Sequence, residues 1–324
     1  MIKTAGLLVI LALAAGLLSG CSSNTVDNSA GGQNPAFLTL ATGGTAGMYY
    51  PFGDALAKVF NKKADVQVTV QATDGSVENL RLVNQKQAEL AIVQSDMMDY
   101  AYHGREAFKE KLTMLRGIAI LYPEMIQIVV RADSGINTIT DLKGKKVGVG
   151  SPGSGTEANF RQLAAIYELD YKEFQPLYLS FGASAAQFKE KAIDAFIVVS
   201  ASPSSIIQDI AVQHKIKILS MPDTVIAKVK QQYPFLAPVT IPANTYKGQT
   251  AAIRTVAVQA ALIANSQVPE EVVYTMTKSL FESQSELVRL HSKGKELSLE
   301  KATRGMSIPL HPGAIQYYKE KGVY

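Results

Sequence analysis

Short apolar segments with strand character alternate with amphipathic helical segments over two long stretches of the chain. The first stretch predicts strands at residues 37–42, 66–71 and 90–94, and helices at 48–62, 76–87 and from Ser95 onward. The second predicts strands at 145–150, 176–180, 195–199 and 216–220, and helices at 156–169, 183–191 and 204–213. Such alternation is typical of α/β folds, in which helices cover both faces of a mostly parallel sheet. Two α/β units are therefore predicted.

The remaining segments extend this pattern. Apolar runs at 113–121 and 125–131 are separated by Tyr122, Pro123 and Glu124. Another strand is predicted at 251–261, followed by helical segments at 270–282, 286–291, 299–304 and 311–321. A chain of 324 residues with 47% hydrophobic composition can bury two cores, since domains typically hold about 100–200 residues.

The N-terminal segment has the plan of a bacterial signal peptide. Lys3 precedes a 14-residue apolar run at 5–18, which ends at the small residues Ser19 and Gly20 before Cys21. The run is shorter than the ~20 residues of a bilayer span. We therefore predict a signal peptide at 1–20 and regard a transmembrane anchor as the weaker alternative.

Cys21 is the only cysteine, so an internal disulfide is impossible. The residues Leu18 to Cys21 resemble a bacterial lipobox, in which the cysteine sulfur receives diacylglycerol. A free thiol or an intermolecular bridge would not explain its position at the end of the apolar run. We expect a lipid on Cys21 to anchor the protein to a membrane on the extracytoplasmic side, in the periplasm or at the cell surface. Which membrane carries the anchor stays open.

Residues 21–35 are expected to form a flexible tether. They are rich in Ser, Asn and Gly and have no apolar period, and flexible-chain scaling gives them a reach of roughly 20 Å. Removal of residues 1–20 takes one Lys and no acid, which leaves 31 basic and 28 acidic side chains. This near-neutral balance, without blocks of like charge, argues against a nucleic-acid partner.

Two glycine-rich loops, each between a predicted strand and a helix, are the most informative local features. They read ATGGTAGMYYP at 41–51 and GSPGSGTE at 150–157. Glycines let several backbone N–H groups point into one concavity, and helix N-termini and hydroxyl groups add positive potential and donors. Two further polar junctions lie at 71–79 and 94–96. We predict an anion site built from the following residues: Gly44, Thr45, Ala46, Tyr49, Ser76, Gln94, Ser95, Ser151, Gly153, Ser154, Gly155, Thr156 and Ser200. Tyr49 is expected to form a wall of this site with its hydroxyl on the ligand.

Other kinds of site have weaker support. A single such loop would be most simply a turn. Gly148, Gly150 and Gly153 form a G-x-G-x-x-G, but no acid follows at the end of the next strand, as dinucleotide binding requires. The histidines show no metal-ligand spacing and stand at four scattered positions: His103, His214, His291 and His311. We predict no metal and no cofactor.

Several motifs in order resemble the TAXI family of extracytoplasmic solute receptors, the binding components of one class of TRAP transporters. They are ATGGTAGMYYPFG, QATDGSVENLRLV, AELAIVQSD, LKGKKVGVGSPGSGTE and VTIPANTYKGQ, and the likeness runs over residues 37–324. It implies a two-lobed periplasmic-binding-protein fold with two crossings between the lobes (type II). One lobe would comprise 36–124 plus 257–324 and the other 125–256, with hinge crossings near 124–128 and 251–256. Hinge closure would then trap the ligand between the lobes.

The resemblance also implies a ligand class and a partner. The ligand would be a small organic anion such as glutamate, 2-oxoglutarate or a related carboxylate or amino acid, and the partner a TRAP-type membrane permease. None of the loops offers an Arg for a bidentate carboxylate contact, and Arg81 and Arg161 lie within the following helices. We expect a monomeric receptor and not an enzyme. The alternatives are a lipid-anchored serine esterase or amidase that uses Ser151 or Ser154, and a sensor that presents its ligand to a signalling partner.

Overall fold

The computed structural model describes residues 35–324, which form one compact unit. The predicted signal peptide, the predicted lipid site Cys21 and residues 21–34 of the predicted tether lie outside the described residues. Within residues 35–324, no helix is both long and apolar enough to cross a bilayer.

The strands of the described part form one continuous sheet in the order β2-β1-β3-β10-β4-β7-β5-β6, with β8 beside β4 and β9 beside β10. Their bounds are β1 Ala36–Ala41, β2 Val66–Gln71, β3 Leu90–Gln94, β4 Leu115–Arg131, β5 Lys146–Gly148, β6 Gln175–Leu177, β7 Ala195–Ser200, β8 Ile216–Ile218, β9 Ala237–Ile241 and β10 Ile253–Asn265.

Parallel pairing is confined to the outer strands, so the sheet is mixed and the expectation of mostly parallel sheets is wrong. β1 pairs in parallel with β2 and β3, and β5 with β6 and β7. Every pair that involves β4 or β10 is antiparallel. The reason is that these two long strands run through the sheet in opposite directions, so each outer set of parallel strands meets a strand running against it.

β4 is one 17-residue strand, whereas the sequence predicts two runs separated at 122–124. Pro123 lies within it and faces Gln259 of β10. On the other edge of β4, pairing with β7 begins only at Met125. Proline is tolerated at a sheet edge because no ladder there requires its missing N–H. The strand therefore continues through the proline.

Ten α-helices accompany the sheet in the described part. Their bounds are α1 Tyr49–Lys63, α2 Ser76–Asn84, α3 Ser95–His103, α4 Gly155–Ile166, α5 Phe181–Lys189, α6 Ser205–Gln213, α7 Asp223–Gln232, α8 Glu270–Glu282, α9 Gln284–Leu290 and α10 Pro312–Glu320. The sequence analysis did not predict α7 or β9. The helix expected at 299–304 is reduced to the 3-10 turn Leu299–Lys301, which accompanies two further turns at Ile139–Leu142 and Ser292–Glu296.

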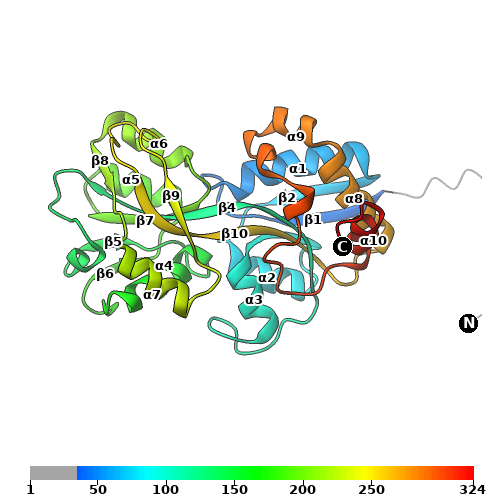
Figure 1. Cartoon of the computed structure of the whole chain (residues 1–324), viewed down its shortest axis with the longest axis horizontal. Coiled ribbons are helices and arrows are strands. Elements are labelled where there is room, and N and C mark those ends of the chain that lie inside the picture. The colour runs from blue at the N-terminus through cyan, green and yellow to red at the C-terminus, as the bar shows by residue number, and fades with distance from the viewer. Residues whose placement is uncertain (1–34) are drawn as a thin grey trace, which may run out of the picture. The chain divides into compact units, whose positions relative to one another are not determined.

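The elements gather into two lobes joined by β4 and β10, as Figure 1 shows. The first lobe holds β1–β3, α1–α3 and α8–α10; the second holds β5–β9 and α4–α7. Each lobe has buried apolar clusters on both faces of the sheet. β4 contributes Ile118 to a core of the first lobe and Ile128 to one of the second, and β10 contributes Leu262 and Val256 in the same way. The predicted two-lobed α/β fold is confirmed.

Candidate ligand-binding cleft

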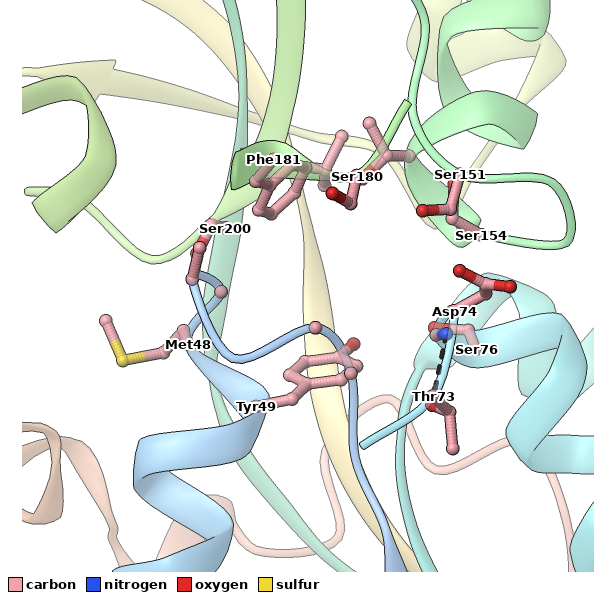
Figure 2. Close-up of a pocket in the computed structure, with 18 of the residues that line it drawn as sticks. Met48, Tyr49, Thr73, Asp74, Ser76, Ser151, Ser154, Ser180, Phe181 and Ser200 are labelled. Atoms are coloured by element: carbon pink, nitrogen blue, oxygen red, sulfur yellow. Dashed lines mark hydrogen bonds between the residues drawn. The ribbon is translucent and has the colours of Figure 1, made fainter. Parts of the chain in front are cut away.

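A cavity of about 210 Å³ lies where loops of the two lobes face each other. In Figure 2, Tyr49, Asp74 and Ser76 lie on one side and Ser151, Ser154 and Phe181 on the other. The lining residues are Gly43, Gly44, Thr45, Ala46, Gly47, Met48, Tyr49, Thr73, Asp74, Gly75, Ser76, Gln94, Glu124, Ser151, Ser154, Gly155, Thr156, Ser180, Phe181, Gly182, Val199 and Ser200. All the predicted ligand-binding residues except Ser95 and Gly153 are among them, and their role in binding stays a prediction.

Four helices begin at residues that line the cavity. α1 begins at Tyr49 and α2 at Ser76 in the first lobe, and α4 begins at Gly155 and α5 at Phe181 in the second. A fifth, α3, has the lining residue Gln94 as its N-cap. The first turn of a helix has unpaired N–H groups and the positive end of the helix dipole. Both lobes therefore contribute positive potential to the cavity without a cationic side chain.

Local sequence explains how the loops of the second lobe reach the cavity. Gly150 has a φ of 107°, which a residue with a side chain rarely adopts. Ser154 then caps α4, because its Oγ accepts a hydrogen bond from the N–H of Glu157 at 3.2 Å. Ser180 caps α5 in the same way, with its Oγ 3.3 Å from the nitrogen of Ala183. Both caps end a loop and start a helix at the cavity wall.

The two predicted residues outside the lining have other contacts. Ser95 Oγ accepts a hydrogen bond from the N–H of Gln259 at 3.3 Å, which ties α3 to β10. The carbonyl of Gly153 accepts one from the N–H of Val77 at 3.2 Å, so the loop before α4 bonds directly to α2 of the other lobe. Their contacts therefore join elements, and neither residue faces the cavity.

The hydroxyl of Tyr49, expected on the ligand, instead donates a 2.6 Å hydrogen bond to Glu124 Oε2. Tyr49 does line the cavity with its side chain, as predicted. Its hydroxyl is turned to Glu124 because β4 brings that carboxyl group beside the start of α1. A contact of this hydroxyl with a ligand stays a prediction, and the chain presents a tyrosine–glutamate pair.

Glu124 and Asp96 are buried acids near the cleft. Glu124 is only 2% exposed, and burial raises its pKa from 4.5 to about 8, while the hydrogen bond from Tyr49 lowers it. Burial also raises the pKa of Asp96 to about 6, against the hydrogen bonds from the Asn159 amide and the Met97 N–H. An unpaired charge is costly to bury. Glu124 is thus mainly protonated at neutral pH, while most Asp96 is ionised.

Contacts across the cleft hold the two lobes together. The Asn159 amide of α4 donates to Asp96 Oδ2 of α3 at 2.6 Å, and the Gln162 amide donates to the Tyr100 hydroxyl at 3.3 Å. Gly155 lies so close to the first lobe that a Cβ built on it would be 1.6 Å from Gln94 Oε1. These contacts describe a closed arrangement of the lobes.

Several lining residues were not predicted. Thr73 and Asp74 belong to the polar junction at 71–79, which the sequence analysis noted without choosing them. Ser180 and Phe181 stand at a strand-to-helix junction like the others, so the same argument could have found them. Glu124 could have been noticed because it lies between two apolar runs of the sequence. Charged residues in such surroundings are seldom buried unless they are paired.

The geometry does not assemble the parts of a serine hydrolase. No histidine, lysine or arginine is among the lining residues in the described part of the chain. Ser151 and Ser154 therefore have no basic partner of the kind that activates a serine nucleophile. Residues 35–324 also contain no group of three His, Cys, Asp or Glu side chains that could hold a metal ion.

A two-lobed α/β fold with two long crossing strands and a cavity between the lobes defines the class of periplasmic binding proteins. The chain belongs to the NMT1-like family, whose model matches residues 40–322.

Individual relatives are distant. The chain is 28% identical to the arginine-binding extracellular protein ArtP of Bacillus subtilis (strain 168) over 183 residues, which are 53% of this chain and 60% of ArtP. Less than two thirds of ArtP is therefore matched. The structure of the periplasmic binding protein BugD has a TM-score of 0.55 at 13% identity, over 90% of this chain and 94% of that one. A binding protein component of an ABC phosphonate transporter from Pseudomonas aeruginosa has a TM-score of 0.52 at 11% identity, over 80% and 79% of the two chains. These structures share the fold.

Proposed function

We propose that the protein is an extracytoplasmic solute receptor, not an enzyme, which binds a small organic acid between its lobes and delivers it to a membrane transporter. One observation supports this most strongly: helix N-termini from both lobes meet at a single small cavity. A carboxylate in that cavity would receive backbone N–H groups from both lobes. Because it would contact both, its binding would favour the closed arrangement.

The size and lining of the cavity limit the ligand. A volume of about 210 Å³ is below the ~300–1,000 Å³ of drug-sized sites. The lining combines hydroxyl groups, backbone and two aromatic side chains, Tyr49 and Phe181, which suits glutamate, 2-oxoglutarate or a related carboxylate.

We propose a TRAP-type permease as the partner, driven by an ion gradient. The resemblance to the TAXI receptors rests on several motifs in order along residues 37–324. The name of the Pseudomonas aeruginosa protein points instead to an ABC transporter, but that protein shares the fold alone. Reconstitution with a candidate TRAP permease and with a candidate ABC transporter would decide between them, since uptake would need an ion gradient in one case and ATP in the other.

The hinge and the anchor belong to the same proposal. β4 and β10 would bend near 124–128 and 251–256, so that 36–124 plus 257–324 move against 125–256. A lipid on Cys21 would confine a monomeric receptor to the membrane surface, where capture occurs at raised local concentration. Replacement of Cys21 by Ser is expected to release the protein from membranes, and unchanged membrane association would contradict the anchor.

Binding can be tested directly by a thermal-shift screen of the purified protein against amino acids, dicarboxylates and 2-oxoacids. A ligand that binds only the folded state stabilises it by about 2.7 kcal/mol when its concentration is 100 times its Kd. The unfolding midpoint therefore rises. If no small acid raises the midpoint while an ester is hydrolysed, the receptor proposal is wrong. A signalling role would instead appear as ligand-dependent binding to a partner without transport.

A further inference from the structure

The cavity contains carboxyl groups but no cation to balance them. Among its lining residues in the described part, the only ionisable side chains besides Tyr49 are Asp74 and Glu124. Asp74 is exposed, whereas Glu124 is buried. A ligand that carried only negative charge would bring it close to these groups, so the lining is better matched to a ligand that has a positive group as well.

Glu124 has the position needed to contact that positive group. Its Oε2 is occupied by the Tyr49 hydroxyl at 2.6 Å. Its Oε1 has no hydrogen-bond partner among residues 35–324. This atom is not one of the fully buried polar atoms without a partner, so it keeps some accessible surface. One carboxyl oxygen is therefore held by the protein, while the other is left for a group inside the cavity.

We propose that Glu124 selects ligands with a protonated amino group, and that such a group displaces the proton held by Glu124 in the empty cavity. The O–H bond of the carboxyl group breaks and the proton leaves to water. The carboxylate then pairs with the ammonium group, which keeps its own protons. Burial of the closed site favours this exchange over an unpaired carboxylate, because the buried negative charge gains a partner.

The hydrogen bond from Tyr49 favours the carboxylate form of Glu124 and repulsion from Asp96 disfavours it, but neither group supplies a positive charge. Tyr49 of α1 donates to Glu124, and Tyr122 of β4 is close enough for its ionised form to be disfavoured by Glu124. Asp96 of α3 raises the pKa of Glu124 by repulsion. Opposite Glu124, β10 presents Val258, which has no ionisable group. The turn Ser292–Glu296 also packs against β4, but its Lys293 is paired with Glu296. The groups that act on Glu124 are thus negative or neutral, and a positive charge beside it must come with a proton or a ligand.

This inference rests on the proposed function. Matched pairs of ligands distinguish a failure of the inference from a failure of the proposed function. L-Glutamate carries an ammonium group where 2-oxoglutarate has a keto oxygen. L-Alanine and pyruvate differ in the same way. Isothermal titration of each pair in phosphate and in Tris at pH 7 measures the protons exchanged. We expect the amino member of a pair to bind more tightly and to release up to about one proton per ligand. Binding of 2-oxo acids alone, or as tightly as their amino partners, would overturn the inference but leave the receptor function standing.

The variant Glu124→Gln isolates the carboxyl group, because a glutamine can still accept the hydrogen bond from Tyr49. Between pH 6 and 8 the affinity of the wild type for the amino ligand should rise about tenfold per pH unit, and the variant should lack both this slope and the proton release. Asp74→Asn removes the other lining carboxyl group and should preserve both. Equal proton release in the wild type and in Glu124→Gln, or binding of no amino acid in the screen, would refute the exchange.

Discussion

Closure of the lobes depends on the absence of a side chain at position 155. A Cβ on Gly155 would lie 1.6 Å from Oε1 and 2.4 Å from Cδ of Gln94. Gly155 begins α4 of the second lobe, and Gln94 ends β3 of the first. The overlap therefore exists only when the lobes are together. We predict that Gly155→Ala weakens ligand binding without destabilising the unliganded protein.

The expected size follows from the packing around Gln94. Its side chain is 3% exposed and borders the cavity, so the new methyl group would push its terminal amide into the space that a ligand needs. Overpacking of this kind typically costs about 1–3 kcal/mol. At 1.4 kcal/mol per factor of ten, the loss of affinity should be roughly 5- to 150-fold.

The assay is titration calorimetry with the tightest ligand of the thermal-shift screen, together with the unfolding midpoint of the unliganded protein. Gly182→Ala is the matched control, since its Cβ would make an ordinary 3.7 Å contact with Ala46 across the same cleft. Gln94→Ala combined with Gly155→Ala should recover part of the loss, because it removes the atoms in conflict. Wild-type affinity in Gly155→Ala, or an equal loss in the control, would refute the steric argument.

Three further predictions concern the polar groups of the cleft. Burial raises the pKa of Glu124 to about 8 in the folded protein from 4.5, so the folded state binds more protons and this residue's contribution to stability is lost as pH rises from about 5 to 8. Unfolding midpoints of the unliganded wild type should fall over that range relative to Glu124→Gln. Asn159→Ala removes the amide that reaches Asp96 across the cleft, and at pH 7 should lower affinity about 10- to 100-fold, since hydrogen bonds to charged groups contribute about 1.5–3 kcal/mol. Tyr49→Ala and Ser154→Ala should each weaken binding and leave the protein folded, as judged by circular dichroism and titration.

Each of these has a result that would contradict it. Parallel midpoint curves for the wild type and Glu124→Gln would mean that the carboxyl group titrates normally. Undiminished affinity in Asn159→Ala would mean that the contact with Asp96 does not persist in the liganded form. Wild-type affinity in both Tyr49→Ala and Ser154→Ala would remove these residues from the site.

The fold could be predicted because its elements are encoded locally. β2 and β3 lie at the predicted residues, and α1 differs from its predicted span by one residue at each end. β4 was harder to predict because Pro123 usually ends a strand, and only the unpaired edge beside it makes the proline acceptable. The direction of pairing could not be predicted either, because it depends on which strands become neighbours.

Part of the candidate site could be predicted for the same reason. Glycine and hydroxyl residues at a strand-to-helix junction place backbone N–H groups at a helix start wherever the helix lies, so the loops at 41–51 and 150–157 could be recognised from sequence alone. Ser95 and Gly153 share that composition but turn toward Gln259 and Val77. The direction of an individual group within a junction depends on the packing around it.

The sequence by itself determined the α/β units and the polar character of the loops, because both arise from residues close together in the chain. Only the tertiary structure decided what those loops enclose. Glu124 stands 75 residues from Tyr49, and Asn159 stands 63 from Asp96. Neither pair has any local signal, and each exists because β4 and the two lobes bring distant segments into contact. Burial in that contact is also what raises the pKa of Glu124 and makes a proton part of the site.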